Sequence, residues 1–587
     1  MYTNYRSIQI LLCLLKKHNI SDIVLSPGGS DIPLIHSIET DPFFKCYSVV
    51  DERSAAYYAM GIAQIKNRPV ACVCTSGSAV CNYLPGITEA FYQSVPVLAI
   101  TADKNPYYQG QLEIQKINQL GVFNGVVKNA VELPLIKDEE DEWLCNRLVN
   151  EALIALNHHG TGPVHINVPV VGSYNVYDCA ALPDERMIEV HTLGDNKEIW
   201  QQSAELLSKA NKILVVVGQN IVFTEQDRIY LNDFFKKYNC VYSVEHLSNL
   251  ECEGTVYSYP VSEVVGLNAL NQLVPDIVIS IGNNLSAYKL KPFLRAHYKE
   301  IKNWLISESG EVRDAYKCLT DIFECSVSEF FRQMVKFAPE NAQKNYSYYN
   351  DWNVNIEKMK YKDYEFSNFY VAQKLSETIP ENSVLHTAIL NSTRVMQFFK
   401  LAKGVRTFSN VGTLGIDGCM STFAGAAAGT DNLAFLLIGD LSFFYDMNAA
   451  GIRSIGPNVR IILLNNGGGS EFHFFMGREK IPTLDAYICA EHNKKAEGWI
   501  KSLGYDYYSA SSKEEFNNII HKFGKKSDKP MFLEIFTQME EDAVLTKQYY
   551  KENEESSTQG RLKGVVKSII PERQINKIKK IIDIVKS

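Results

Sequence analysis

The stretches IGDLSFFYDMN (438–448) and IILLNNGGGSEF (461–472) decide the fold of this chain. Each begins in an apolar, strand-like run and ends in small and polar residues, and a helix-length segment separates the two. Asp440 and Asn466 therefore follow two strands, and open parallel sheets gather ligands at the carboxyl ends of their strands. A carboxylate and an amide oxygen are hard ligands that suit Mg²⁺. The glycines at 467–469 let the backbone approach a diphosphate closely.

Either half of this pattern alone is more typical of a turn, because Gly-Asp and Asn-Asn-Gly are common turn sequences. Their order and spacing together favour a cofactor site over a surface aspartate followed by an Asn-Gly turn. The pattern resembles the thiamine-diphosphate motif, and this resemblance implies that the chain binds thiamine diphosphate with Mg²⁺.

Glu52 is the second signal. In CYSVVDERSAAYYAMGIAQ (46–64) an apolar strand ends at Asp51 and Glu52, and a helical pattern with small residues begins there. Thiamine chemistry requires a carboxylic group hydrogen-bonded to the pyrimidine ring nitrogen of the cofactor. The alternative is an acidic residue that the helix dipole favours at a helix N-terminus. Together with the 440–466 pattern, Glu52 is interpreted as the catalytic carboxylate.

Composition restricts the function further. The chain has 587 residues, 46% of them hydrophobic and 21% charged, which predicts a globular protein of several domains. A net charge of −8 argues against nucleic-acid binding. The 13 cysteines are scattered, without paired CxxC units, and Cys72, Cys74 and Cys81 are expected to be buried thiols rather than metal ligands. We find no convincing signal peptide and no apolar run of membrane-spanning length, so a cytoplasmic protein is expected.

Alternating strand and helix patterns predict an α/β protein with three doubly wound parallel-sheet domains. The expected parts are an N-terminal pyrimidine-binding domain (1–180), a central scaffold domain (185–340), a crossover segment (341–366), a C-terminal diphosphate- and Mg²⁺-binding domain (367–550) and a tail (555–587). The tail is basic and amphipathic, which suits a membrane surface or a partner, or docking on the chain's own core or on a second copy.

Several stretches carry a family resemblance: SPGGSDIPL (26–34), VDERSAAYYAMGIA (50–63), TSGSAVCNYLPGITEA (75–90), LAITADKNP (98–106), GPVHINVP (162–169), SNVGTLGIDGCMSTFAGAAAG (409–429), GDLSFFYDMN (439–448) and NNGGGSEF (465–472). They resemble the thiamine-diphosphate enzymes of the pyruvate decarboxylase and acetolactate synthase superfamily. Within it, the chain most resembles the menaquinone-pathway synthases, which join 2-oxoglutarate to isochorismate. The resemblance covers residues from about 1 to 545.

The resemblance implies a homodimer or homotetramer with active sites at the interface, where Glu52 serves a cofactor bound mainly by the partner's third domain. It implies that Asp440, Asn466 and the carbonyl of Gly468 hold Mg²⁺, and that Ile416 wedges the two cofactor rings into a folded conformation. The other implied cofactor contacts are Ser392, Asp417, Gly418, Gly439, Leu441, Ser442 and Phe472.

The substrate-binding positions depart from the family pattern. The candidates in this chain are Gly29, Ser30, Lys104, Gln115, Lys289, Arg394 and His473. Family arginines fall on Lys104, Lys289, Met396 and Val411, and lysine does not reproduce the planar fork with which arginine clamps a carboxylate.

The chain keeps the family's cofactor-binding residues, but the family's substrate-binding arginines are replaced. This combination predicts a thiamine-diphosphate- and Mg²⁺-dependent 2-oxo acid decarboxylase or carboligase. Its small-molecule donor or acceptor is expected to differ from that of the family. The first alternative is the menaquinone-pathway synthase itself. The second is a cofactor-binding scaffold whose catalysis has lapsed.

Overall fold

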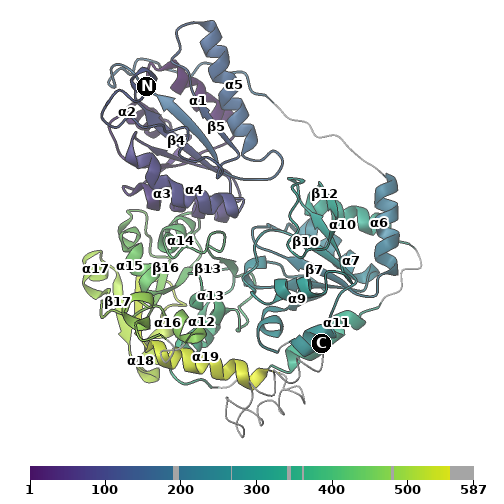
Figure 1. Cartoon of the computed structure of the whole chain (residues 1–587). Helices are drawn as coiled ribbons and strands as arrows, with labels where there is room; N and C mark the ends of the chain where they lie inside the picture. Colours follow the sequence, from purple (N-terminus) through teal and green to yellow (C-terminus); the bar gives the residue numbers. More distant parts are fainter. Residues whose placement is uncertain (189–196, 266, 340–344, 360–362, 477–480, 555–587) are drawn as a thin grey trace, which may run out of the picture.

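The computed structural model describes residues 1–188, 197–265, 267–339, 345–359, 363–476 and 481–554. It contains three six-stranded sheets in which every strand pair is parallel, each flanked by helices (Figure 1). The predicted fold class, three doubly wound α/β domains, is confirmed.

The N-terminal sheet has the strand order β2-β1-β3-β4-β6-β5. Helices α1, α2 and α5 cover one face of this sheet, and α3 and α4 cover the other. The strands are β1 (Asp22–Leu25), β2 (Lys45–Ser48), β3 (Val70–Cys74), β4 (Val97–Asp103), β5 (Asn129–Glu132) and β6 (Val164–Pro169), and the helices are α1 (Arg6–Lys17), α2 (Ile32–Glu39), α3 (Glu52–Lys66), α4 (Ser78–Tyr92), η1 (Pro106–Tyr108) and α5 (Glu139–Ala155).

The C-terminal sheet has the order β14-β13-β15-β16-β18-β17, which is the same topology as that of the N-terminal sheet. Its strands are β13 (Val384–Thr387), β14 (Arg406–Phe408), β15 (Ala434–Gly439), β16 (Val459–Asn465), β17 (Asp506–Ala510) and β18 (Met531–Phe536). Its helices are α12 (Asn368–Thr378), α13 (Asn391–Met396), α14 (Cys419–Ala428), α15 (Asp440–Tyr445), η4 (Met447–Gly451), α16 (Ser470–Phe475), η5 (Leu484–Ile488), α17 (Glu497–Ser502), α18 (Lys513–Ile520) and α19 (Met539–Asn553).

The central sheet has the order β12-β11-β10-β7-β8-β9. The chain builds the sheet outward from β7 to one side and then, from β10 on, to the other side, as in nucleotide-binding α/β folds. Its strands are β7 (Ile213–Val217), β8 (Cys240–Val244), β9 (Thr255–Tyr257), β10 (Ile277–Ile281), β11 (Lys302–Ile306) and β12 (Leu319–Phe323). Its helices are α6 (Lys197–Lys209), α7 (Glu225–Lys237), η2 (His246–Ser248), η3 (Val261–Val265), α8 (Leu267–Asn271), α9 (Leu290–Ala296) and α10 (Val327–Lys336).

The central and C-terminal domains share one apolar core. Helix α11 (Ser347–Glu357) lies within the crossover segment and buries Tyr348 and Trp352 in this core. The aromatic residues of that segment thus pack, although its sequence shows no clear helical periodicity. The predicted basic tail, 555–587, lies outside the described residues.

The N-terminal and C-terminal domains meet where α3 crosses α14 (Figure 1). A Cβ atom built on Gly61 in α3 falls 2.0 Å from the carbonyl oxygen of Thr422, and one built on Gly425 in α14 falls 2.1 Å from that of Tyr58. Only glycine allows the two helix backbones to approach this closely. The small residues of 55–61 therefore serve an interdomain contact.

The cysteines of the described residues form no disulfide bond. Cys72 and Cys74 are buried, as predicted, whereas Cys81 is exposed because it lies on the outer side of α4. Among the helices of the described residues, none combines the length and the apolar character needed to cross a bilayer.

Candidate active site

Asp440 lies where β15 ends and α15 begins, and its side chain is almost completely buried. Its Oδ2 atom accepts hydrogen bonds from the backbone N–H groups of Gly467 (2.8 Å) and Gly468 (3.0 Å), and its Oδ1 atom from that of Leu441 (2.6 Å). The two predicted strand ends therefore meet, because β15 and β16 are neighbours in the sheet.

Asn466 follows β16 at the same edge. Its Nδ2 atom donates to Oδ2 of Asp542 (3.0 Å), which also accepts from the hydroxyl of Thr537 (2.7 Å). Burial raises the pKa of Asp542 to about 6, although its hydrogen-bond donors oppose the shift. Since the amide nitrogen is held by Asp542, the Oδ1 atom of Asn466 points away from that carboxylate and is free to meet a cation.

Glycines flank both residues, because Gly439 precedes Asp440 and Gly467 and Gly468 follow Asn466. Gly467 and Gly468 have φ angles of +87° and +154°, and a Cβ on Gly468 would lie 2.6 Å from the carbonyl oxygen of Cys489. A Cβ on Gly439 would meet nothing within 4 Å. A buried carboxylate, an amide side chain and the open space at Gly439 fit the Mg²⁺–diphosphate group predicted from the sequence.

His492 is a further residue of this site that the sequence interpretation missed. Its Nε2 atom lies 3.6 Å from Oδ2 of Asp440 and has no hydrogen-bond partner among the described residues, although the side chain is buried. A cavity of about 550 Å³ opens beside it, and Asn466, Gly467 and Lys494 are among its lining residues. A buried, unpartnered nitrogen facing the candidate metal ligands is a second sign that this pocket accommodates a polar group. No local motif marks His492, because a loop brings it back to the site.

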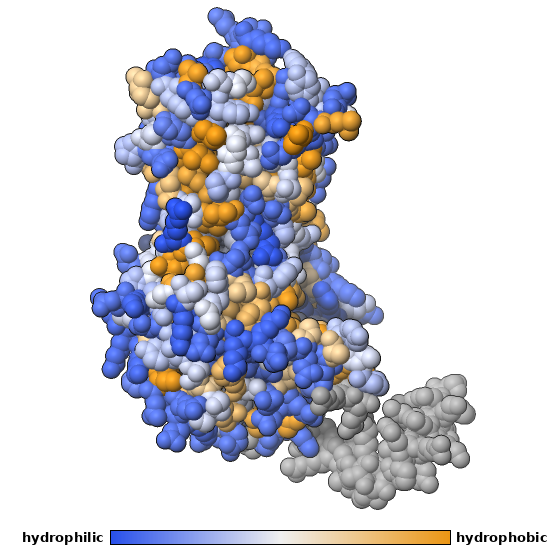
Figure 2. Space-filling model, turned by 90° about the vertical axis from the view of Figure 1, so that its left-hand side faces the viewer, coloured by the Kyte–Doolittle hydropathy of each residue, from blue (hydrophilic) through white to orange (hydrophobic). Residues whose placement is uncertain are grey.

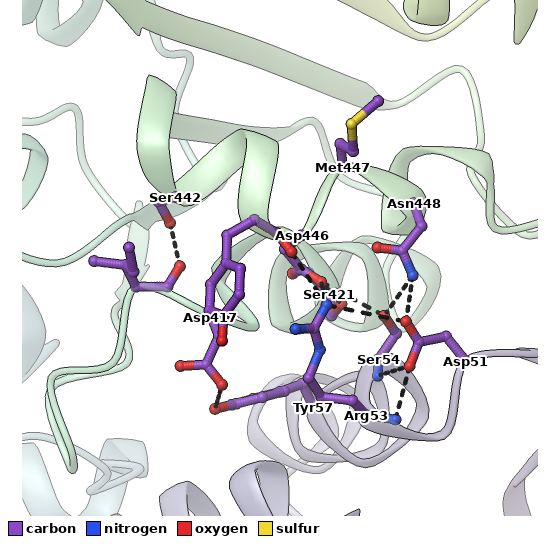
Figure 3. A network of polar contacts seen from close by, with 12 residues as sticks. Asp51, Arg53, Ser54, Tyr57, Asp417, Ser421, Ser442, Asp446, Met447 and Asn448 are labelled. Carbon is purple, nitrogen blue, oxygen red and sulfur yellow. Dashed lines mark hydrogen bonds and ion pairs between the residues drawn. The ribbon is translucent and has the colours of Figure 1, made fainter. Parts of the chain in front are cut away.

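The loop before α14 carries three of the candidate cofactor contacts. The carbonyl oxygen of Ile416 accepts from the hydroxyl of Ser442 (2.6 Å), and Oδ2 of Asp417 accepts from the hydroxyl of Tyr57 (2.9 Å) (Figure 3). Gly418 has a φ of +74°, and a Cβ there would lie 2.3 Å from the ring of Tyr57. The Ile416 side chain remains 38% exposed, so this fixed loop presents an apolar side chain on its surface.

Glu89 in α4 also holds this loop, and nothing in the sequence pattern indicated it. The fully buried carboxylate accepts from the backbone N–H groups of Gly412 (2.9 Å) and Thr413 (2.7 Å). The N-terminal domain therefore positions the loop of the C-terminal domain that carries Ile416.

Two other predicted cofactor contacts lie nearby. Ser392 is buried in α13, after β13, the strand that neighbours β15. The Phe472 ring is half-buried against Leu484, Cys489 and Met539, below the glycine run.

Glu52 is the first residue of α3, and the carboxylate of Asp51 caps this helix by accepting from the N–H groups of Arg53 (3.0 Å) and Ser54 (3.3 Å). Oε2 of Glu52 accepts from Nδ2 of Asn82 in α4 (3.1 Å). Its neighbours in α3 contact the segment after α15, where Arg53 lies 3.7 Å from Asp446 (Figure 3). Glu52 and Asp440 therefore have different partners within one chain.

Four substrate-binding candidates lie on loops at the carboxyl end of the N-terminal sheet. Ser30, which follows Gly29, contacts Thr75 through its N–H group (3.1 Å) and Ser76 through its hydroxyl (3.2 Å). Lys104 lies 3.2 Å from Glu113 and donates to the carbonyl of Ile114, which precedes Gln115. Gln115 lies against Gly77 with a φ of +57°.

The other three candidates lie on the central and C-terminal domains. The N–H group of Lys289 donates to Glu263 (2.7 Å), Arg394 forms a buried ion pair with Glu471, and Nε2 of His473 lies 2.6 Å from Asp485. The side chains of Arg394 and His473 and the backbone of Lys289 thus have partners within the chain, which the sequence alone did not indicate.

Comparison with known proteins defines the class. Residues 7–122 match the model of the thiamine pyrophosphate enzyme N-terminal TPP binding domain. The chain is also similar to proteins named 2-succinyl-5-enolpyruvyl-6-hydroxy-3-cyclohexene-1-carboxylate synthase. It is 36% identical to that of Bacteroides thetaiotaomicron (94% of this chain, 99% of the relative), 36% identical to that of Phocaeicola vulgatus (94% and 99%) and 32% identical to that of Flavobacterium johnsoniae (94% and 100%). The chain belongs to the thiamine-diphosphate-dependent enzymes and, within them, to the family of these synthases.

Proposed function

We propose that this protein catalyses the reaction for which its relatives are named, a thiamine-diphosphate- and Mg²⁺-dependent joining of a decarboxylated 2-oxo acid to an acceptor. The family resemblance implies 2-oxoglutarate as the donor and isochorismate as the acceptor. The replaced arginines had favoured an enzyme with a different substrate. Identity of 36% over nearly the full length of both chains instead supports the activity for which the relatives are named. The observation that carries the proposal is the meeting of Asp440 with the 466–468 turn.

The chain's own residues would divide the work as follows. Asp440, Asn466 and the carbonyl oxygen of Gly468 would hold Mg²⁺, and the cation would offset the negative charge of the diphosphate. The cofactor, when bound, supplies the nucleophilic carbon at which a 2-oxo acid loses CO₂. Ile416, on a loop fixed by Glu89 and Ser442, would orient the cofactor rings.

Glu52 would hold a proton at its carboxyl group against the pyrimidine nitrogen of the cofactor. Because its partners differ from those of Asp440 within one chain, we propose that it serves a site completed by a second copy. Exposed large hydrophobic side chains lie near α3, on both sides of the junction between the N-terminal and C-terminal domains: Val50 (70% exposed), Leu84 and Tyr445. Figure 2 shows apolar surface at the middle of one face of the molecule, which suits a homodimer or homotetramer contact.

Product analysis tests the proposed reaction. The purified protein with thiamine diphosphate and Mg²⁺ would be given isochorismate and one of several 2-oxo acids, and the products identified by mass spectrometry. A product that retains four carbons of 2-oxoglutarate, together with released CO₂, is the expected result. Turnover of another 2-oxo acid with no use of 2-oxoglutarate would overturn the proposed substrates but not the enzyme class.

One observation favours a second candidate, a carboligase with a less acidic donor. The buried guanidinium of Arg394 is already paired with Glu471, and Lys289 lies beside Glu263. An absence of turnover with every 2-oxo acid, despite cofactor binding, would instead favour the lapsed scaffold.

A further inference from the structure

Arg394 and Glu471 form a bidentate ion pair between α13 and α16. Nη1 of Arg394 donates to Oε2 of Glu471 (2.5 Å), and Nη2 donates to Oε1 (2.7 Å). Nη1 also donates to Oδ1 of Asn391 (2.6 Å). Two parallel bonds of this kind use the full fork that a guanidinium group offers to a carboxylate.

The pair lies beside the candidate cofactor site and close to the surface. Glu471 follows the glycine run directly in α16, and Asn391 donates to the hydroxyl of Ser470 (2.8 Å), which ties the two helices together. The rings of Phe474 and Phe475 lie 5.1 and 5.5 Å from the guanidinium carbon. Phe475 is 64% exposed, so the aromatic cover on this side of the buried pair reaches the surface.

Two further charged residues, Lys289 and Glu263, lie near this ion pair. Burial alone lowers the pKa of Arg394, but the hydrogen bonds and the charge of Glu471 raise it above its ordinary value, so the guanidinium stays charged. Lys289 and Arg394 both lie close enough to Glu263 to lower its pKa, against the larger effect of burial, which raises it. Arg394 thus faces a carboxylate of the chain itself, and the ammonium group of Lys289 donates to the backbone carbonyl oxygen of Glu263.

We propose that Glu471 is a specificity-determining residue that competes with the acidic group of the substrate for Arg394. This inference rests on the proposed function, in which the donor is an acid, and on the sequence prediction that Arg394 binds the substrate. Glu471 already neutralises the guanidinium and occupies its Nη1–Nη2 edge, so a dicarboxylic donor gains the bidentate contact at this edge only by displacing Glu471. The internal carboxylate therefore weakens the binding of dicarboxylic donors and leaves that of monocarboxylic donors almost unchanged.

Binding of two unreactive acids tests this inference without any need for turnover. Glutarate and pentanoate have the same chain length and differ by one carboxylate, and their dissociation constants would be measured calorimetrically on the cofactor-loaded protein. The substitution Glu471→Gln keeps the shape of the side chain and one acceptor for Arg394 but removes the charge. We expect it to tighten glutarate binding at least about tenfold and to change pentanoate binding less than about twofold.

A matched control is Glu329→Gln in α10, which removes the carboxylate of another bidentate pair (Arg332 Nε–Oε2 2.8 Å, Nη2–Oε1 2.7 Å) on the central domain. This variant should bind both acids as the wild type does. An unchanged ratio of the two affinities in Glu471→Gln, or equal tightening of both acids, would overturn the inference.

A second variant covers the risk that an unpaired buried arginine destabilises the fold. Glu471→Asp keeps the charge and shortens its reach, so its affinity for glutarate should lie between those of wild type and Glu471→Gln. Glutarate should also raise the melting temperature of Glu471→Gln more than that of wild type. If these results appear but no 2-oxo acid is turned over, the competition at Arg394 stands and only the proposed reaction fails.

Discussion

At the residue scale, the proposed role of Glu52 gives the sharpest expectation. Glu52→Gln keeps the size of the side chain and its contact with Asn82 but removes the acidic proton. We expect kcat to fall about 10²-fold or more, which is the range of general acid–base contributions. The dissociation constant of thiamine diphosphate, measured by calorimetry, should change only a few-fold. Full turnover in this variant would show that another group carries the proton.

The proposed metal site predicts that Asp440→Asn weakens cofactor binding, unlike Glu52→Gln. This substitution removes the charge that faces the 467–468 N–H groups and would hold Mg²⁺. Cofactor affinity should fall at least about tenfold, because a charge-assisted contact of about 1.5–3 kcal/mol is lost. A Mg²⁺ titration of cofactor binding measures this change. If the variant bound the cofactor with wild-type affinity and the same dependence on Mg²⁺, Asp440 would not be a metal ligand.

Residues that follow strands were predictable from sequence, and those brought in by distant contacts were not. Asp440 and Asn466 carry a local signal, because each follows an apolar run that forms a strand. Glu89 binds the 412–413 backbone, and Glu471 pairs with Arg394, across long separations in sequence. Such pairings depend on how helices pack, and neither periodicity nor composition records them.

At the element scale, the α3–α14 crossing depends on glycine. Gly61→Ala places a methyl group 2.0 Å from the carbonyl oxygen of Thr422, so the helices must move apart. We expect a loss of about 1–3 kcal/mol in the free energy of unfolding, as in other overpacked contacts. The matched control is Gly498→Ala in α17, where the added Cβ meets nothing within 4 Å and should be neutral or stabilising by up to about 1 kcal/mol. Equal thermal unfolding midpoints for the two variants would contradict the close approach.

The same junction predicts a pH dependence through Asp446, which accepts from the N–H (2.7 Å) and hydroxyl (2.8 Å) of Ser421. Burial raises its pKa from 3.8 to about 6, although the bonds from Ser421 and the charge of Arg53 oppose the shift. The folded state therefore binds the proton more tightly than the unfolded state. Its contribution to stability is fully present below about pH 4 and is lost as pH rises through about 6.

Asp446→Asn removes this titration. The difference in thermal unfolding midpoint, wild type minus variant, should become smaller between pH 4.5 and pH 7. Comparing the two proteins cancels the titration of all other carboxyl groups. A difference that is flat or grows across this range would mean that Asp446 does not titrate as its burial indicates.

At the scale of the whole molecule, the parallel sheets and their helices were predictable because their strands read as continuous apolar runs, such as 70–74 and 434–438. Whether a second copy completes each site could not be predicted from spacing, since that depends on how two molecules pack.

Complementation between two inactive variants tests the central claim most directly. Glu52→Gln and Asp440→Asn chains would be unfolded together, refolded and assayed with cofactor, Mg²⁺ and the 2-oxo acid that the wild type uses. If one site takes Glu52 from one copy and Asp440 from the other, half of the dimers gain one intact site, and about a quarter of wild-type activity returns. Activity that stays at the level of the separate variants, while the wild type regains its own after the same treatment, would contradict a shared site.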